Sequence, residues 1–162
     1  MENDDIIIRH DRREGDNELI VDLHRRGYAQ EGDRFGETFP PFVLETVLAA
    51  DLDAAGGSRV WFAEMGGQTI GCTAMIDRGV RGQLRWVVLL PAARGRGVGK
   101  RLFDLAMTHA HRQGWTEVFL ETTDGLDASM TLYRKAGFTE VEVSEADLWH
   151  GRGQLIVMAK HI

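Results

Sequence analysis

The sequence is poor in cysteine and has no long apolar run. Its one cysteine, Cys72, cannot form a disulfide within the chain, as expected for a protein in a reducing compartment. No stretch approaches the roughly 18 consecutive apolar residues that a membrane-spanning helix needs. The first residues, MENDDIIIRHD, lack the basic and then apolar order of a secretion signal. The sequence therefore predicts a cytoplasmic protein without a membrane partner.

Positive charge is also scarce. The 19 Lys and Arg residues against 25 Asp and Glu residues give a formal net charge of −6. Nucleic-acid-binding proteins present a basic face, so this balance argues against a nucleic-acid partner and is compatible with cationic substrates such as amines. We expect no metal site: His109 and His111 lie two apart on an expected helix, about 200° around its axis, and cannot chelate one ion.

The rest of the composition is that of a globular protein. Hydrophobic residues make up 43% and charged residues 27% of 162 residues, so we expect one domain over residues 1–162. Hydrophobic periodicity and turn signals give the order β-α-α-β-β-β-α-β-α-β-β. This order predicts an α/β fold of about seven strands and about four helices, in which helices cover the faces of a mixed sheet.

Local signals place several boundaries. Asp16 and Asp124 are expected as helix N-caps, and the Pro40–Pro41 pair is expected to lie in a loop. The Gly-Gly pair in MGGQ (65–68) predicts a hairpin between two strands, and Gly137 is expected just after the end of a helix.

Glycine is concentrated after an apolar strand, in WVVLLPAARGRGVGKRLFDLA (86–106). A P-loop would need a glycine at position 94, which is Arg94, and a hydroxyl residue at 101, which is Arg101. A dinucleotide-binding G-x-G-x-x-G would need a third glycine at position 100, which is Lys100. Glu121 lies at about the right distance for a ribose contact, so a nucleotide-binding oxidoreductase stays open as a lesser alternative.

A helix that begins in this loop would suit an anion. Its first N–H groups have no intrahelical partner and carry partial positive charge, and glycines let a bulky phosphate approach the backbone. Arg94, Arg96, Lys100 and Arg101 add charge. The alternative is an exposed glycine turn with solvated arginines.

A third pattern is R-x-x-G-x-G at Arg94, Gly97 and Gly99, accompanied by LYRKAGF (132–138) near the C-terminus. With these motifs and the element order, the chain resembles the GNAT superfamily of acyl-CoA-dependent N-acyltransferases over nearly its whole length. It is similar to the acetyltransferase domains fused behind MarR-type regulators. The resemblance implies a mostly antiparallel mixed sheet and acetyl-CoA as cosubstrate. The residues that it implies for binding acetyl-CoA are Leu89, Leu90, Arg94, Gly95, Arg96, Gly97, Val98, Gly99 and Lys100.

The resemblance also implies catalytic roles. A bulge near Leu89 would let backbone groups bond the pantetheine arm and polarise the thioester carbonyl. Tyr133, the tyrosine of LYRKAGF, would protonate the leaving thiolate. Alternatively, Tyr133 is a residue of the hydrophobic core, because Leu126, Met130 and Tyr133 share one helical face. By analogy, the EGDRFGETF (31–39) and EADLWHGRG (145–153) loops would wall the acceptor pocket.

The general base is less well marked. Many family members carry an acid on the strand before the glycine loop, but QLRWVVLL (83–90) has none. Glu121 on the next strand is the first candidate, directly or through water, and His150 is another. The family's frequent asparagine at the start of the tyrosine helix is replaced by Leu126.

We therefore expect an N-acetyltransferase that moves an acetyl group from acetyl-CoA to a primary amine of a small molecule or protein. The amine would attack directly and form a tetrahedral intermediate. The alternative is a non-catalytic acyl-CoA-binding or protein-interaction module of the same fold. A second copy of the chain, as in a homodimer, is a further candidate partner.

Overall fold

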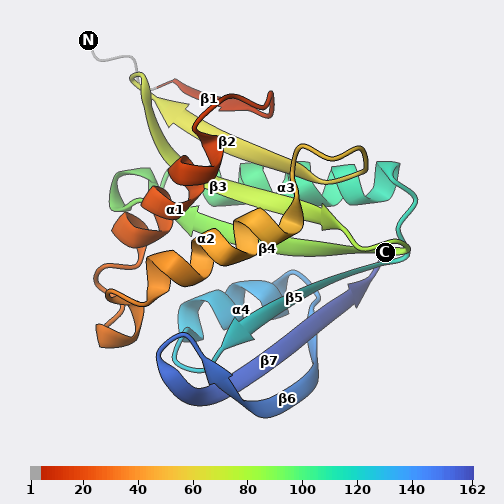
Figure 1. Cartoon of the computed structure of the whole chain (residues 1–162). Helices are drawn as coiled ribbons and strands as arrows, with labels where there is room; N and C mark the ends of the chain where they lie inside the picture. The colour runs from red at the N-terminus through yellow and green to blue at the C-terminus, as the bar shows by residue number, and fades with distance from the viewer. Residues whose placement is uncertain (1–4) are drawn as a thin grey trace.

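The computed structural model describes residues 5–162, and the predicted order of strands and helices is confirmed there (Figure 1). Short 3-10 turns cover Asp33–Phe35 and Pro91–Ala93. The interpretation of residues 1–162 as one domain stays a prediction, and residues 1–4 lie outside the described residues. The elements are β1 Ile6–Arg9, α1 Asp16–Gly27, α2 Phe39–Ala50, β2 Arg59–Met65, β3 Gln68–Asp77, β4 Arg81–Leu89, α3 Val98–Arg112, β5 Glu117–Thr123, α4 Asp127–Lys135, β6 Thr139–Leu148 and β7 Gly151–His161.

The strands form one sheet in the order β1-β2-β3-β4-β5-β7-β6. Neighbours are antiparallel except for β4 and β5, so the predicted mixed, mostly antiparallel sheet is confirmed. The parallel pairing joins only Arg81–Gln83 to Glu117–Phe119, although both strands run on for several residues. Beyond this junction β4 and β5 diverge, as Figure 1 shows.

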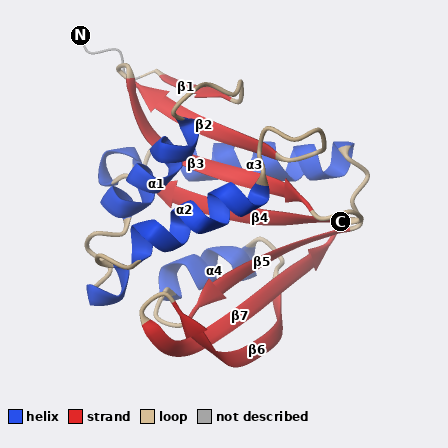
Figure 2. Ribbon diagram, viewed as in Figure 1, coloured by secondary structure: helices blue, strands red, loops and turns tan. Residues whose placement is uncertain are grey.

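The helices cover both faces of the sheet and produce two hydrophobic cores (Figure 2). On one face, α1 and α2 bury Ile20, Leu23 and Val47 against the alternate residues of β2 to β4. On the other face, α3 and α4 bury residues such as Leu102 and Met130. None of the helices in residues 5–162 combines the length and apolar character that a membrane crossing requires.

Two local expectations are confirmed by backbone angles. Gly66 and Gly67 join β2 to β3 with φ of 58° and 79°, values typical of a two-residue hairpin turn. Gly137, with φ of 98°, follows α4, and the Phe138 N–H donates to the Tyr133 carbonyl (3.0 Å) as in a Schellman motif.

Two other expectations are wrong. Pro40 and Pro41 lie in the first turn of α2, where a missing N–H removes no helical hydrogen bond. Asp16 is the first residue of α1 rather than its N-cap, which is Gly15. The Asp16 carboxylate is buried and pairs with Arg9 (2.8 Å). This ion pair fixes the start of α1 to β1.

Candidate active site

The glycine-rich loop begins α3 with an uncapped N-terminus. Gly97 is the N-cap, with φ of 75° and ψ of 9°, and no side chain caps the helix. Gly95 has φ of 76°, so both residues adopt a conformation that side chains disfavour. A Cβ atom at either position would meet nothing within 4 Å. The first N–H groups of α3 therefore lie beside open space, without intrahelical partners.

Gly99 and Leu90 serve packing in this region. A Cβ atom at Gly99 would lie 3.1 Å from Leu89 Cδ1, so the glycine lets α3 approach the end of β4. Leu90 is buried, and its N–H donates to the Ile70 carbonyl (2.8 Å). Val98 is buried in the core beside α3. The side chains of Leu90 and Val98 thus belong to the core.

The basic side chains of the loop contact groups of the protein itself. Arg94 Nη2 donates to the carbonyls of Gly27 (3.3 Å) and Leu89 (3.4 Å) and so links the loop to the end of α1 and to β4. Arg96 Nε donates to the Ala92 carbonyl (3.1 Å). Lys100 pairs with Asp104 (2.6 Å) one turn along α3. The positive charge therefore stays close to the helix start.

A β-bulge interrupts β4 earlier than expected. Cys72 and Ala74 of β3 face Val88 and Arg85, so β4 has one extra residue in this interval. Trp86 lies in the bulge with φ of 49°, a rare value for a residue other than glycine. The expectation of a bulge near Leu89 is therefore wrong in position, because the irregularity lies at Trp86–Val87.

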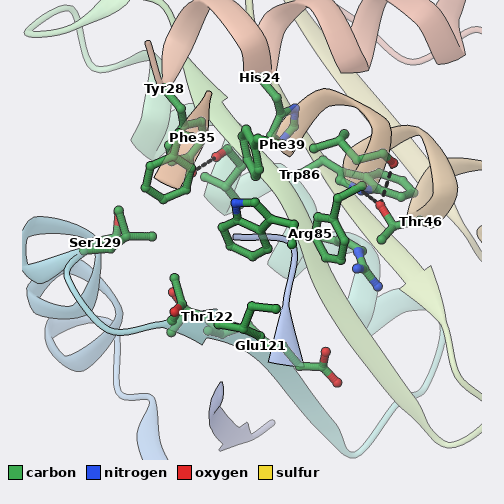
Figure 3. Close-up of a pocket in the computed structure, with 18 of the residues that line it drawn as sticks. His24, Tyr28, Phe35, Phe39, Thr46, Arg85, Trp86, Glu121, Thr122 and Ser129 are labelled. Carbon is green, nitrogen blue, oxygen red and sulfur yellow. Dashed lines mark hydrogen bonds between the residues drawn. The ribbon is translucent and has the colours of Figure 1, made fainter. Parts of the chain in front are cut away.

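Three hydrogen bonds hold the bulge. The Tyr28 hydroxyl donates to the Val87 carbonyl (3.2 Å), and Trp86 Nε1 donates to Thr46 Oγ1 (3.1 Å), as Figure 3 shows. The Cys72 thiol donates to the Trp86 carbonyl (3.1 Å). A residue in a strained backbone conformation costs on the order of 1–3 kcal/mol, and these contacts offset that cost. Neither Tyr28 nor Trp86 was among the site residues predicted from the sequence.

A cavity of about 170 Å³ lies where β4 and β5 separate, on the side of α1 and α2 (Figure 3). Both expected acceptor loops contribute to it, with Phe35 and Phe39 from the first and Leu148 and Trp149 from the second. Much of its wall is aromatic, and its polar lining comes mainly from β4, β5 and α4. The polar group comprises Gln83, Arg85, Glu121, Thr122, Thr123 and Ser129.

Both predicted catalytic residues line this cavity. Tyr133 is half-buried and packs edge-on against Phe138, with ring centroids 6.2 Å apart. Burial raises the pKa of Tyr133 to about 12, so the phenol is protonated at neutral pH. Glu121 is an exposed side chain at the cavity edge. The loop residues from Arg94 to Lys100 do not line the cavity, but β4 leads from the cavity to them.

His24 of α1 lines the cavity and was not predicted. Its Nδ1 lies 2.8 Å from the Ile20 carbonyl, which only accepts, so Nδ1 carries the proton and Nε2 is an acceptor. Burial lowers the pKa of His24 to about 4, and it is therefore neutral at physiological pH.

Arg85 of β4 is a half-buried residue of the cavity wall, and it was not predicted either. Among residues 5–162 its guanidinium makes no hydrogen bond or ion pair; it lies 5.7 Å from the Trp86 ring centroid. Burial lowers the pKa of Arg85, and the charge of Glu121 opposes this shift. The signal was an arginine within the otherwise apolar run LRWVVLL.

Asp124 does not cap α4, and His150 lies outside the cavity lining. The N-cap of α4 is Leu126, so the expectation of Asp124 as N-cap is wrong. Asp124 Oδ1 accepts the Gln154 N–H (3.1 Å), which lowers the pKa of the carboxyl and ties the start of α4 to β7. His150 packs edge-on against Trp149 and does not line the cavity. In the described part of the chain, no three His, Cys, Asp or Glu side chains are placed to hold a metal ion.

Known proteins resemble this chain in sequence and in fold. The uncharacterised N-acetyltransferase YjgM of Escherichia coli is 37% identical over 60 residues, which are 37% of this chain and only 36% of that protein. IAA acetyltransferase of Azospirillum brasilense is 30% identical over 119 residues, 68% of this chain and 74% of that protein. The structure of yncA from Salmonella typhimurium, with its cofactor acetyl-CoA, has the same fold, with a TM-score of 0.69 and 20% identity, and the match covers 97% of this chain and 94% of that one.

A family model also matches the sequence. It is the model of the acetyltransferase (GNAT) family, and it matches residues 21–138, which include β4, the glycine-rich loop and the helix of Tyr133. The finer resemblance to domains fused behind MarR-type regulators stays a prediction. With more than half of its residues matched and the expected sheet order present, the chain belongs to the acetyltransferase (GNAT) family.

Proposed function

We propose that this protein is an acetyltransferase that moves an acetyl group from acetyl-CoA to a primary amine of a small molecule or protein. One observation carries the proposal: a single strand, β4, leads from a cavity lined by Tyr133 and Glu121 to the uncapped N-terminus of α3. The structure of yncA with acetyl-CoA supports the choice of donor.

The proposed donor site fits the backbone of this chain. The N–H groups of Gly95 to Lys100 would hold the pyrophosphate, because the open space at Gly95 and Gly97 lets a phosphate reach them. Beyond Gln83 the edge of β4 that faces β5 has no strand pairing, so backbone groups left unpaired on that edge would be open to a pantetheine arm. Arg94 would keep the loop in place through Gly27 and Leu89.

The reaction requires a base and an acid. Glu121, directly or through water, would take one proton from the substrate ammonium, and the free amine would attack the thioester carbonyl. A C–N bond forms, a tetrahedral intermediate follows, and the C–S bond breaks as Tyr133 gives its proton to the thiolate. The second amine proton restores the phenol, so that one proton passes to solvent for each acetyl group transferred. Burial raises the pKa of Tyr133 to about 12, so the phenol carries its proton at neutral pH, as a general acid must.

The substitution Tyr133→Phe tests this mechanism. It removes the proton donor and keeps the ring, so we expect kcat to fall by about 100-fold or more, the usual contribution of a general acid. The Kd of acetyl-CoA should change by less than about twofold, since the acid acts on the leaving group. Thiol release gives kcat and titration calorimetry gives Kd.

The matched control is Leu132→Ala on the same helix. Leu132 is 67% exposed and does not line the cavity, so its loss should leave kcat unchanged. An unchanged kcat in Tyr133→Phe would remove Tyr133 from the mechanism. Binding of acetyl-CoA without thiol release across a panel of amines would instead support a binding module, and binding of NAD in place of acetyl-CoA would contradict the proposal altogether.

A further inference from the structure

Two opposite charges face the cavity without pairing with each other. Gln83 and Phe119 form the last register pair of β4 and β5, and Arg85 and Glu121 each lie two residues further along. Because side chains alternate along a strand, Arg85 and Glu121 project from the same face as that pair. They share one side of the cavity (Figure 3), yet no ion pair within 4.0 Å joins them.

In the described part of the chain the guanidinium of Arg85 makes no hydrogen bond or ion pair, and it lies 5.7 Å from the centroid of the Trp86 ring. It is half-buried and always charged, and a charge removed from water without a counter-charge is costly. His24, which faces it from α1, is neutral and supplies no negative charge. A ligand with an anionic group would therefore satisfy Arg85, while a cationic group would satisfy Glu121.

Another part of the cavity wall is apolar and aromatic. Trp149 stacks on Phe42, with ring centroids 4.8 Å apart and planes at 30°, and packs against Phe39 at 5.1 Å. A cavity of about 150 Å³ is large enough for benzene. The volume of about 170 Å³ thus matches one small molecule with a ring or a branched apolar group.

We propose that the acceptor is a free amino acid with an apolar or aromatic side chain. This inference rests on the proposed function and names its substrate class. The carboxylate binds Arg85, the ammonium lies toward Glu121, and the side chain contacts the wall of Phe39, Phe42 and Trp149. The ion pair between the substrate carboxylate and Arg85 would also hold the substrate amine beside Glu121, the proposed base. The carboxylate thereby orients the amine for attack.

The test compares amino acids with the matching amines that lack a carboxylate. The pairs are L-phenylalanine with phenethylamine and L-leucine with 3-methylbutylamine, each assayed by thiol release from acetyl-CoA. The wild type should have the higher kcat/KM for the amino acid of each pair. Arg85→Gln should lower kcat/KM for the amino acids by about 10- to 100-fold, the range for a lost charge-assisted hydrogen bond, and leave the amines unchanged.

Two further variants separate recognition from folding. Arg85→Lys keeps the charge without the bidentate geometry and should restore part of the preference. Arg81→Gln removes a guanidinium of the same strand that lies outside the cavity, over the Phe119 ring. It should leave kcat/KM unchanged for both the amino acids and the amines. Equal losses for amino acid and amine in Arg85→Gln would show a structural role and overturn the inference.

The outcome also separates this inference from the proposed function. A wild type that acetylates phenethylamine as well as L-phenylalanine would overturn the amino-acid acceptor and leave the acetyltransferase proposal standing. If none of the four compounds were acetylated, the amino-acid acceptor would also be overturned. Thiol release with other amines would then still decide whether the protein is an acetyltransferase. Absence of acetyl-CoA binding would contradict the proposed function itself.

Discussion

At the residue scale, His24 couples the stability of the protein to pH. The folded pKa of about 4 lies below the ordinary value of 6.5, because the buried ring excludes the charged form. Between these values the unfolded chain binds a proton that the folded chain does not. The free energy of unfolding should therefore fall as pH falls from about 6.5, by about 3 kcal/mol at pH 4.

Urea unfolding at pH 7 and pH 4 measures this loss in the wild type and in His24→Gln. The variant should lose about 3 kcal/mol less than the wild type over this interval. His109, whose pKa is also lowered by burial, contributes equally to both proteins and cancels in the difference. Identical pH dependence in the two proteins would show that His24 takes up its proton in the folded state.

Also at the residue scale, site residues that belong to a sequence motif could be predicted, whereas those defined by packing could not. Tyr133 was a candidate because LYRKAGF carries it, and Glu121 because it follows an apolar strand. Arg85 and Tyr28 belong to no motif, and the contact that defines Tyr28 joins its hydroxyl to the Val87 carbonyl, far along the chain. The family pattern calls for an acid in QLRWVVLL, so the cationic Arg85 matched no expectation there.

At the element scale, Gly97, the N-cap of α3, has a backbone conformation that an alanine would adopt only with strain. Gly97→Ala should cost about 1 kcal/mol of stability. It should also weaken acetyl-CoA binding by about tenfold or more, because the added methyl group would enter the space through which a phosphate reaches the backbone. Urea unfolding and titration calorimetry measure the two effects.

The chain offers a matched control for this substitution. Gly15 is the N-cap of α1, with φ of 87° and nothing within 4 Å of an added Cβ atom. Gly15→Ala should therefore cost similar stability but leave the Kd of acetyl-CoA unchanged. Equal changes of Kd in the two variants would mean that the loop does not contact the donor.

Elements were predictable where one local signal decides them. The β2–β3 hairpin and the end of α4 follow from glycines at left-handed positions. The bulge at Trp86–Val87 was predicted too late in the strand, because hydrogen bonds with Tyr28, Thr46 and Cys72 fix its position and none of these residues is close to it in sequence. Asp124 was misassigned for the same reason, since its carboxylate binds a backbone N–H of β7 instead of capping α4.

At the scale of the whole molecule, the sheet consists of two parts joined by a short parallel junction. A donor bound between β4 and β5 would connect these parts beyond Gln83. Saturating acetyl-CoA should raise the free energy of unfolding by about 2.7 kcal/mol at a ligand concentration of 100 Kd. It should also slow amide hydrogen exchange in residues 84–89 and 120–123 more than in the β2–β3 hairpin.

Thermal unfolding over a series of acetyl-CoA concentrations, with exchange measured by mass spectrometry, checks this expectation. Acetate at the same concentrations is the control, because it carries the acyl group without the pantetheine arm. Uniform protection over the whole sheet would indicate general stabilisation, with no ligand between β4 and β5.

The topology was predictable at this scale because strand and helix order restricts how a mixed sheet can connect. The separation of β4 from β5 could not be predicted. An apolar strand followed by a helix and a second strand predicts a paired parallel unit, and no local residue signal shows that pairing stops after Gln83.

The bulge of β4 also bears on the timing of the proposed reaction. Cys72, the one thiol of the chain, is fully buried with its hydrogen directed at the Trp86 carbonyl, and burial raises the pKa of the thiol. A thiol held in this way is a structural donor and a poor nucleophile. No acetyl group would then wait on Cys72 for an acceptor to arrive. Donor and acceptor would have to occupy the protein together, and scarcity of either one would stop turnover.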